Sequence, residues 1–152
     1  MIYLSALIAS LHYLGLGIGL GSIYARARAF ADLRNDAGAM PRVLSADNFW
    51  GISALLLIGS GLLRAFGGFE KGSSFYLGSG FFHLKMGLLL LLLALEMAPM
   101  LALIRWRLAA RHQPAPELSD KQIQRYTTFS WIELGLMLII MLSASLMARL
   151  RF

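Results

Sequence analysis

The chain contains no cysteine and few charged residues. The absence of cysteine in 152 residues excludes a disulfide, a thiolate metal site and a catalytic thiol. Charged side chains make up 14% of the sequence and hydrophobic ones 58%. Because soluble domains carry about 25% charged residues, a water-soluble globular class is disfavoured. We therefore expect an all-α integral membrane protein.

Acidic residues are the scarcer charge, with 8 of them against 14 lysines and arginines, which gives a net charge of +6. A positive balance can indicate nucleic-acid binding. Here, however, the basic residues flank apolar runs and form no stripe of their own, which favours membrane anchoring. The expected partner is a lipid bilayer, with no nucleic acid.

Four apolar runs are long enough to cross a bilayer core, which needs about 20 helical residues. The first run has no basic n-region and no small-residue cleavage site, so we interpret it as a retained span and not as a signal peptide. The sequence therefore predicts one transmembrane domain over residues 1–152, folded as a four-helix bundle. The spans cover roughly residues 2–24, 47–65, 80–104 and 128–147.

Basic residues in the connections predict the orientation. Nine lysines and arginines lie on the side of the first and third connections, and four lie on the other side. The positive-inside rule then places both termini on the non-cytoplasmic side. The nine are Arg26, Arg28, Arg34, Arg42, Arg105, Arg107, Arg111, Lys121 and Arg125, and the four are Arg64, Lys71, Arg149 and Arg151.

Glycines occupy alternate positions in "HYLGLGIGLGS", residues 12–22. Gly15 and Gly19 are four residues apart, as are Gly17 and Gly21, so each pair lies along one side of a helix and admits a close neighbour. A dinucleotide-binding G-x-G-x-x-G motif does not fit, because leucine or serine occupies its third glycine position. The pattern favours helix packing, including a homo-oligomer formed through glycine-lined faces.

Ionisable residues inside the spans are the most informative feature. Burying a charge at the centre of a helix costs about 2.5–3.5 kcal/mol on insertion scales, so such residues usually face partners or cavities. In the predicted orientation the basic and imidazole groups lie in the outer half, and the two carboxylates lie in the inner third. The outer group is His12, Arg64, His83 and Lys85, and the inner pair is Glu96 and Glu133.

Helical spacing limits which of these side chains face the bundle. Lys85 and Glu96 are eleven residues apart and share a face, whereas His83 points away from Lys85. If Glu96 faces inward, Lys85 is the inward member of the pair and His83 lies at the rim. Simpler roles stay open, because Arg64 and Lys85 can snorkel to the headgroups and the carboxylates can act as helix-joining hydrogen-bond partners.

The stretch "GLLRAFGGFEKGSSFYLGSGFFHLKMGLLLL", residues 61–91, resembles the signature of a small bacterial membrane family, the domain of unknown function 2214. An arginine closes the second helix, a K-G-x-x-F-Y turn follows, and F-H-x-K opens the third helix. The resemblance implies a multi-pass protein of the bacterial inner (plasma) membrane. Its positions here are Arg64, Lys71, Gly72, Phe75, Tyr76, Phe82, His83 and Lys85.

A more distant likeness is to HemJ-type protoporphyrinogen oxidases and CopD-like membrane domains. "ALIASLHYLGLGIGLGSIYARARAF" is similar to the first HemJ helix, and "FHLKMGLLLLLLALEM" to a later one. The likeness matches His12 and Lys85 to the HemJ histidine and lysine, which implies binding of b-type haem. The later helix departs from HemJ at Glu96, because the HemJ helix ends in Tyr-His there.

The leading hypothesis is therefore a membrane protein that binds haem b for electron transfer to quinone or for porphyrinogen-type oxidation. His12 would ligate the iron as the metal ligand, and His83 or Lys85 would supply a second ligand. Glu96 and Glu133 would carry protons. The alternative is a cofactor-free oligomeric transporter or channel, or a lipid-binding subunit of a membrane complex. The residues expected around a haem are His12, Lys85, His83, Arg64, Tyr76 and Lys71.

Overall fold

The computed structural model describes residues 2–69, 73–111 and 117–149, and these ranges contain helices and no strand. All four long helices are long and apolar enough to cross a membrane, which confirms the predicted all-α class with four candidate spans. The long helices are α1 (Ile2–Asp32), α2 (Met40–Phe66), α4 (Gly80–Ala109) and α5 (Asp120–Arg149), and the short ones are η1 (Ala37–Ala39) and α3 (Ser73–Leu77).

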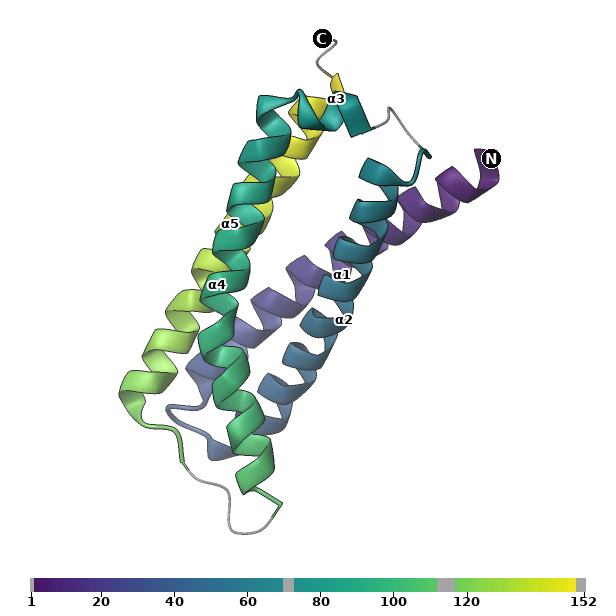
Figure 1. Ribbon diagram of the computed structural model, residues 1–152. Coiled ribbons are helices and arrows are strands. Elements are labelled where there is room, and N and C mark those ends of the chain that lie inside the picture. The colour runs from purple at the N-terminus through teal and green to yellow at the C-terminus, as the bar shows by residue number, and fades with distance from the viewer. Residues whose placement is uncertain (1, 70–72, 112–116, 150–152) are drawn as a thin grey trace.

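The long helices form two pairs. Helix α1 packs against α2 and α5, and α5 also packs against α4. Figure 1 shows that the α1–α2 pair and the α4–α5 pair diverge toward the end of the molecule where α1 begins and α5 ends. The two pairs approach each other toward the opposite end, where η1 joins α1 to α2. Side chains from all four helices can therefore meet in that half.

Helices α1 and α2 extend well beyond their apolar runs. The prediction that residues 25–46 form a connection is wrong at both ends, because α1 continues to Asp32 and α2 begins at Met40. Alanine and arginine are strong helix formers and carry α1 past the apolar run. The short η1 lies between the two helices, and the Asp36 side chain caps its start by accepting from the Gly38 N–H. Arg26 consequently lies inside a helix.

The start of α5 follows the sequence signal closely. The Gln122 backbone N–H donates to Ser119 Oγ at 3.4 Å, and the Ser119 N–H donates to Gln122 Oε1 at 3.1 Å. This reciprocal pair is a capping box, made by Ser119 and the glutamine three residues after it. The polar residues after this capping box are helical, so α5 begins at Asp120, eight residues before the predicted start of the span at residue 128.

The two glycine pairs of α1 have different surroundings. A Cβ added at Gly15 or Gly19 would lie against α2, at 3.0 Å from Leu56 Cβ and 2.5 Å from Ser53 Oγ respectively. At Gly17 or Gly21 it would meet nothing within 4 Å. One glycine face therefore brings α1 against α2, and the other is left open.

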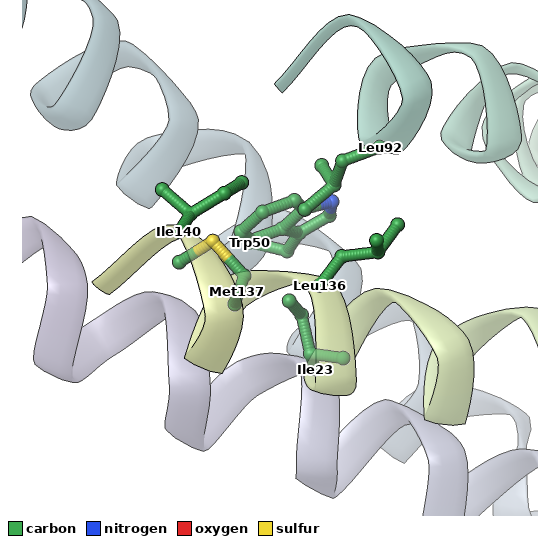
Figure 2. Packing of buried hydrophobic residues seen from close by; sticks show 6 residues of the cluster. All are labelled: Ile23, Trp50, Leu92, Leu136, Met137 and Ile140. Carbon is green, nitrogen blue, oxygen red and sulfur yellow. The ribbon is translucent and has the colours of Figure 1, made fainter. Parts of the chain in front are cut away.

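Buried apolar side chains form two larger core clusters, and a smaller third cluster joins Ala65, Tyr76 and Met147. Figure 2 shows the first, in which side chains from the three other long helices surround the Trp50 indole of α2. The second lies nearer to η1 and includes Phe30 and Val43. The polar site described below lies between them. The first cluster is Ile23, Trp50, Leu92, Leu136, Met137 and Ile140, and the second is Ala29, Phe30, Met40, Val43, Leu103 and Tyr126.

Candidate functional site, a buried ion cluster

Arg26 on α1 binds a carboxylate from each of the other three long helices. Its guanidinium is completely buried. Nη1 donates to Glu96 Oε1 at 2.8 Å and Nη2 donates to Glu96 Oε2 at 2.6 Å. Nη2 also donates to Glu133 Oε2 at 2.5 Å, and Nη1 to Asp47 Oδ1 at 3.1 Å. One cation thus ties α1, α2, α4 and α5 together.

Helical periodicity explains why this cluster lies between two apolar layers. On each helix the residue one turn from the charged group, in the direction of Trp50, belongs to the first apolar cluster. In the opposite direction, Phe30 follows Arg26 by one turn and Val43 precedes Asp47 by one turn. Apolar layers therefore flank the cluster on both sides. The four residues toward the first layer are Ile23, Trp50, Leu92 and Met137.

The geometry of the cluster meets the conditions for holding a charge in an apolar interior. The Arg26–Glu96 contact uses two parallel N–H···O bonds, the geometry that a planar guanidinium and a carboxylate make best. An unpaired charge at this position would be strongly destabilising. Glu96 and Glu133, the predicted inner carboxylates, thus share a single site, and Arg26 is its centre.

The cluster reaches the accessible surface where Arg107 binds Asp47, and 11% of the Glu96 side chain is exposed as well. Arg107 Nη2 donates to Asp47 Oδ2 at 3.1 Å, to Asn48 Oδ1 at 3.0 Å and to the Leu44 carbonyl at 3.3 Å. Side-chain exposure is 0% for Arg26, 13% for Asp47 and 34% for Arg107. Asp47 therefore links the buried cation to a half-exposed one.

Charges and hydrogen bonds in the cluster do not balance. Three carboxylates (Asp47, Glu96 and Glu133) face two guanidiniums (Arg26 and Arg107). Within the described residues, Glu133 Oε1 and Arg26 Nε are buried without a hydrogen-bond partner. Ser130 Oγ, one turn from Glu133 on α5, is in the same condition. These unsatisfied polar atoms could therefore bind a proton or a water molecule.

His12 lies at the α1–α2 contact, well away from this cluster along α1. Its Nδ1 is 2.8 Å from Ser60 Oγ, and the Ser60 hydroxyl donates to the Leu56 carbonyl. Since the single hydroxyl proton of Ser60 is used on Leu56, Ser60 accepts from the Nδ1–H of His12. The lone pair of the neutral ring then lies on Nε2, the arrangement found for metal-ligating histidines whose other nitrogen is fixed by a partner.

Two of the other predicted site residues lie at the end of the molecule where the helix pairs diverge. The Arg64 guanidinium carbon is 5.9 Å from the centre of the Tyr13 ring, one residue from His12. Tyr76 on α3 is buried in a cluster with Ala65 and Met147, which brings α3 to α2 and α5. Tyr76 thus packs against Ala65, the residue that follows Arg64 on α2.

The remaining predicted residues belong to α4 and to the connection before it. His83 is exposed, and its Nδ1 is 2.9 Å from the Ser79 carbonyl at the start of α4. Lys85 is half-buried and Glu96 is buried, in agreement with the facing predicted from their spacing. Lys71 lies outside the described residues. No group of three or more histidine, aspartate or glutamate side chains that could hold a metal occurs in residues 2–69, 73–111 and 117–149.

Three members of the cluster, Arg26, Asp47 and Arg107, were not predicted as site residues from the sequence. The first was counted as a solvated loop cation, which is wrong because it is a fully buried helical residue. Spacing carried a signal, since Arg26 follows Gly19 by seven residues and so shares the packed face of α1. That signal becomes useful only when α1 is known to continue past the apolar run.

One protein-family model matches this chain over nearly its whole length. The family model for predicted membrane proteins called DUF2214 covers residues 4–150. No curated protein and no solved structure gives a significant match. Four apolar helices and the family match together describe a predicted integral membrane protein. The chain belongs to the DUF2214 family of predicted membrane proteins.

Proposed function

We propose that the buried ion cluster is a proton-exchanging centre in a multi-pass protein of the bacterial inner membrane, and that Glu133 holds the exchangeable proton beside Arg26. We also propose that both termini lie on the non-cytoplasmic side, because the first and third connections hold most of the basic residues. Ionisable residues that are buried between membrane helices mark proton or ion pathways by default. Glu96 and Glu133, the two carboxylates expected to carry protons, both bind the same guanidinium.

The observation that carries this proposal is the unpaired Glu133 Oε1. Every other carboxylate oxygen in the cluster binds a guanidinium, whereas this buried oxygen has no hydrogen-bond partner among the described residues. With all groups ionised, the three carboxylates exceed the two guanidiniums by one negative charge. One added proton on Oε1 cancels that excess and leaves the Glu133 Oε2 contact with Arg26 in place.

The proton would enter from the side of Arg107. Asp47 is the partly exposed carboxylate that contacts both guanidiniums, so it can accept a proton from water and pass it toward the interior. Glu96 and Glu133 both contact Arg26 Nη2, which brings their carboxylates to one point. The Trp50 cluster blocks the opposite direction with apolar side chains. Coupled chemistry or transport would draw on this stored proton.

Infrared difference spectra between high and low pH test this function in purified protein. We expect a carboxylic acid carbonyl band that appears with protonation and is lost in Glu133→Gln, which keeps the size and the acceptor oxygen of the side chain. About one proton fewer should be taken up per chain. Glu117→Gln, at an exposed glutamate, is the matched control and should leave the band unchanged.

A folded Glu133→Gln protein that keeps the band would contradict the proposal. The absence of any such band in the parent protein would do the same, and the cluster would then be a permanent ionic link between helices. Proton or solute flux across liposomes that Glu96→Gln abolishes would favour the cofactor-free transporter and would place the same carboxylates in its path.

A second function is favoured by the His12–Ser60 contact. We propose that His12 Nε2 ligates the iron of a b-type haem, because Ser60 fixes the ring through Nδ1. A bound haem would supply one-electron transfer, toward a quinone or a porphyrin substrate. Arg64, Tyr76 and the basic residues Lys71, His83 and Lys85 would hold its propionates, and His83 or Lys85 is the proposed second ligand.

An absorption spectrum tests the haem proposal directly. Protein purified in detergent is expected to show a Soret band that disappears in His12→Ala. Ser60→Ala should weaken haem binding about tenfold in a titration, because removal of a partner that orients a ligand commonly costs that much. Comparison of His83→Ala with Lys85→Met identifies the second ligand. A parent protein that stays colourless and does not bind added haemin would refute it.

A further inference from the structure

A groove runs between α1 and α2 toward the end that carries η1. Its volume is about 570 Å³, and its lining is mainly apolar. Gly17, Gly21 and Ala25 form one wall and Ala46 and Phe49 the other. These residues recur every three or four positions, so each wall is a continuous stripe along its helix.

The glycine wall of this groove has no partner within the described protein. A Cβ at Gly17 or Gly21 would meet nothing within 4 Å, whereas Gly15 and Gly19 are used in the contact with α2. Packing inside the chain therefore explains only one of the two glycine pairs. The open pair leaves an exposed surface without side chains on α1.

Charged side chains line the other end of the same groove. Arg28 and Arg42 both line it, together with Asp32. Arg42 pairs with Asp32 at 3.1 Å and with Asp36 at 3.4 Å, on the surface. Arg28 is exposed and makes no ion pair within the part of the chain that the structure describes. Arg28 follows Gly17 by eleven residues, about 16 Å along the helix, on the same stripe.

We propose that this groove binds one anionic phospholipid, with an acyl chain along Gly17 and Gly21 and the phosphate at Arg28. An apolar groove that ends in a basic site matches the two parts of such a lipid. Arginine is suited to phosphate because its planar donors can bind two oxygens at once.

Charge favours a lipid over a second copy of this chain. Two copies related by a two-fold axis would present the same surface to each other, including Arg28, which has no ion pair within the described residues. Like charges brought together at an interface are costly. An anionic headgroup supplies the missing negative charge, and a zwitterionic one supplies none in net terms.

Native mass spectrometry of the purified full chain, incubated with phosphatidylglycerol or with phosphatidylcholine of the same acyl chains, tests the proposal. We expect phosphatidylglycerol to be retained in preference, one molecule per chain. Arg28→Gln should reduce its retention about fivefold, the contribution of one basic residue near an anionic lipid. Gly21→Leu should remove retention of both lipids, because the leucine side chain fills the groove. The protein should still fold, because nothing lies within 4 Å of a Cβ added at Gly21.

Two variants are matched controls. Arg34→Gln removes an exposed arginine that does not line the groove, and Gly59→Leu adds a side chain to α2 where nothing lies within 4 Å. Both should bind lipid as the parent does. Equal losses in Arg34→Gln and Arg28→Gln, or unchanged binding in folded Gly21→Leu, would overturn the proposal. A chain dimer that Gly21→Leu dissociates would do so too, by assigning the groove to a second copy.

Discussion

Replacing Arg26 with methionine is expected to destabilise the protein severely. The variant leaves the Asp47, Glu96 and Glu133 carboxylates close together without their central cation. Removing one partner of a buried ion pair costs about 3–5 kcal/mol, because the remaining charge is buried without compensation. For a domain of this size the melting temperature should fall by on the order of 10 °C. Thermal unfolding in detergent, followed by tryptophan fluorescence, measures the change.

The control for this prediction lies on the same helix. Arg28→Met removes an exposed arginine that has no ion pair within the described residues, so its melting temperature should stay close to that of the parent. Adding Glu96→Gln and Glu133→Gln to Arg26→Met should restore much of the lost stability, because the uncompensated charges are removed. If Arg26→Met were as stable as Arg28→Met, the buried cluster would not exist as described.

Adding one methyl group at Gly19 is expected to give the second large loss of stability. The new Cβ of Gly19→Ala would lie 2.5 Å from Ser53 Oγ and 3.3 Å from both Met137 and the Trp50 ring. Ser53 cannot rotate away without breaking its 2.7 Å hydrogen bond to the Gly15 carbonyl. Overpacking in a tight interior typically costs about 1–3 kcal/mol, so the melting temperature should fall by several degrees.

Gly21→Ala is the matched control, two residues further along α1. Nothing lies within 4 Å of its added Cβ, so the melting temperature should be unchanged or slightly higher, since alanine is the better helix former. Trp50 lies beside Gly19 and reports the perturbation by its fluorescence. Equal stability of the two alanine variants would show that α1 and α2 do not meet through the Gly15–Gly19 face.

These two predictions separate the architecture from the chemistry proposed for it. The Arg26 and Gly19 variants test helix packing and ion pairing, whatever the protein does. The Glu133→Gln and His12→Ala experiments test proton exchange and haem ligation, and they require that those variants remain folded. A stable Glu133→Gln protein without the infrared band would therefore assign proton exchange to that side chain and would not reflect a general loss of structure.

The sequence alone determined the class of protein and the presence of four candidate membrane spans. Composition and the length of the apolar runs indicate four membrane helices because a bilayer sets both the hydrophobicity and the length that a spanning helix needs. The start of α5 was also predictable, because the Ser119–Gln122 capping box is made by neighbouring residues. The positions of Glu96 and Glu133 along their helices likewise predicted that the two carboxylates lie at similar depths in the membrane.

Only the tertiary structure decided which groups meet. Periodicity gives the face of a helix but not the partner of that face, so it could not join Arg26 to Glu96 and Glu133, which are 70 and 107 residues away. An arginine just beyond an apolar run reads as a loop cation until the helix is seen to continue. The same limit applies to the glycines. Their spacing predicted two packing faces, and the crossing of α1 with α2 selected Gly15 and Gly19 and left Gly17 and Gly21 open.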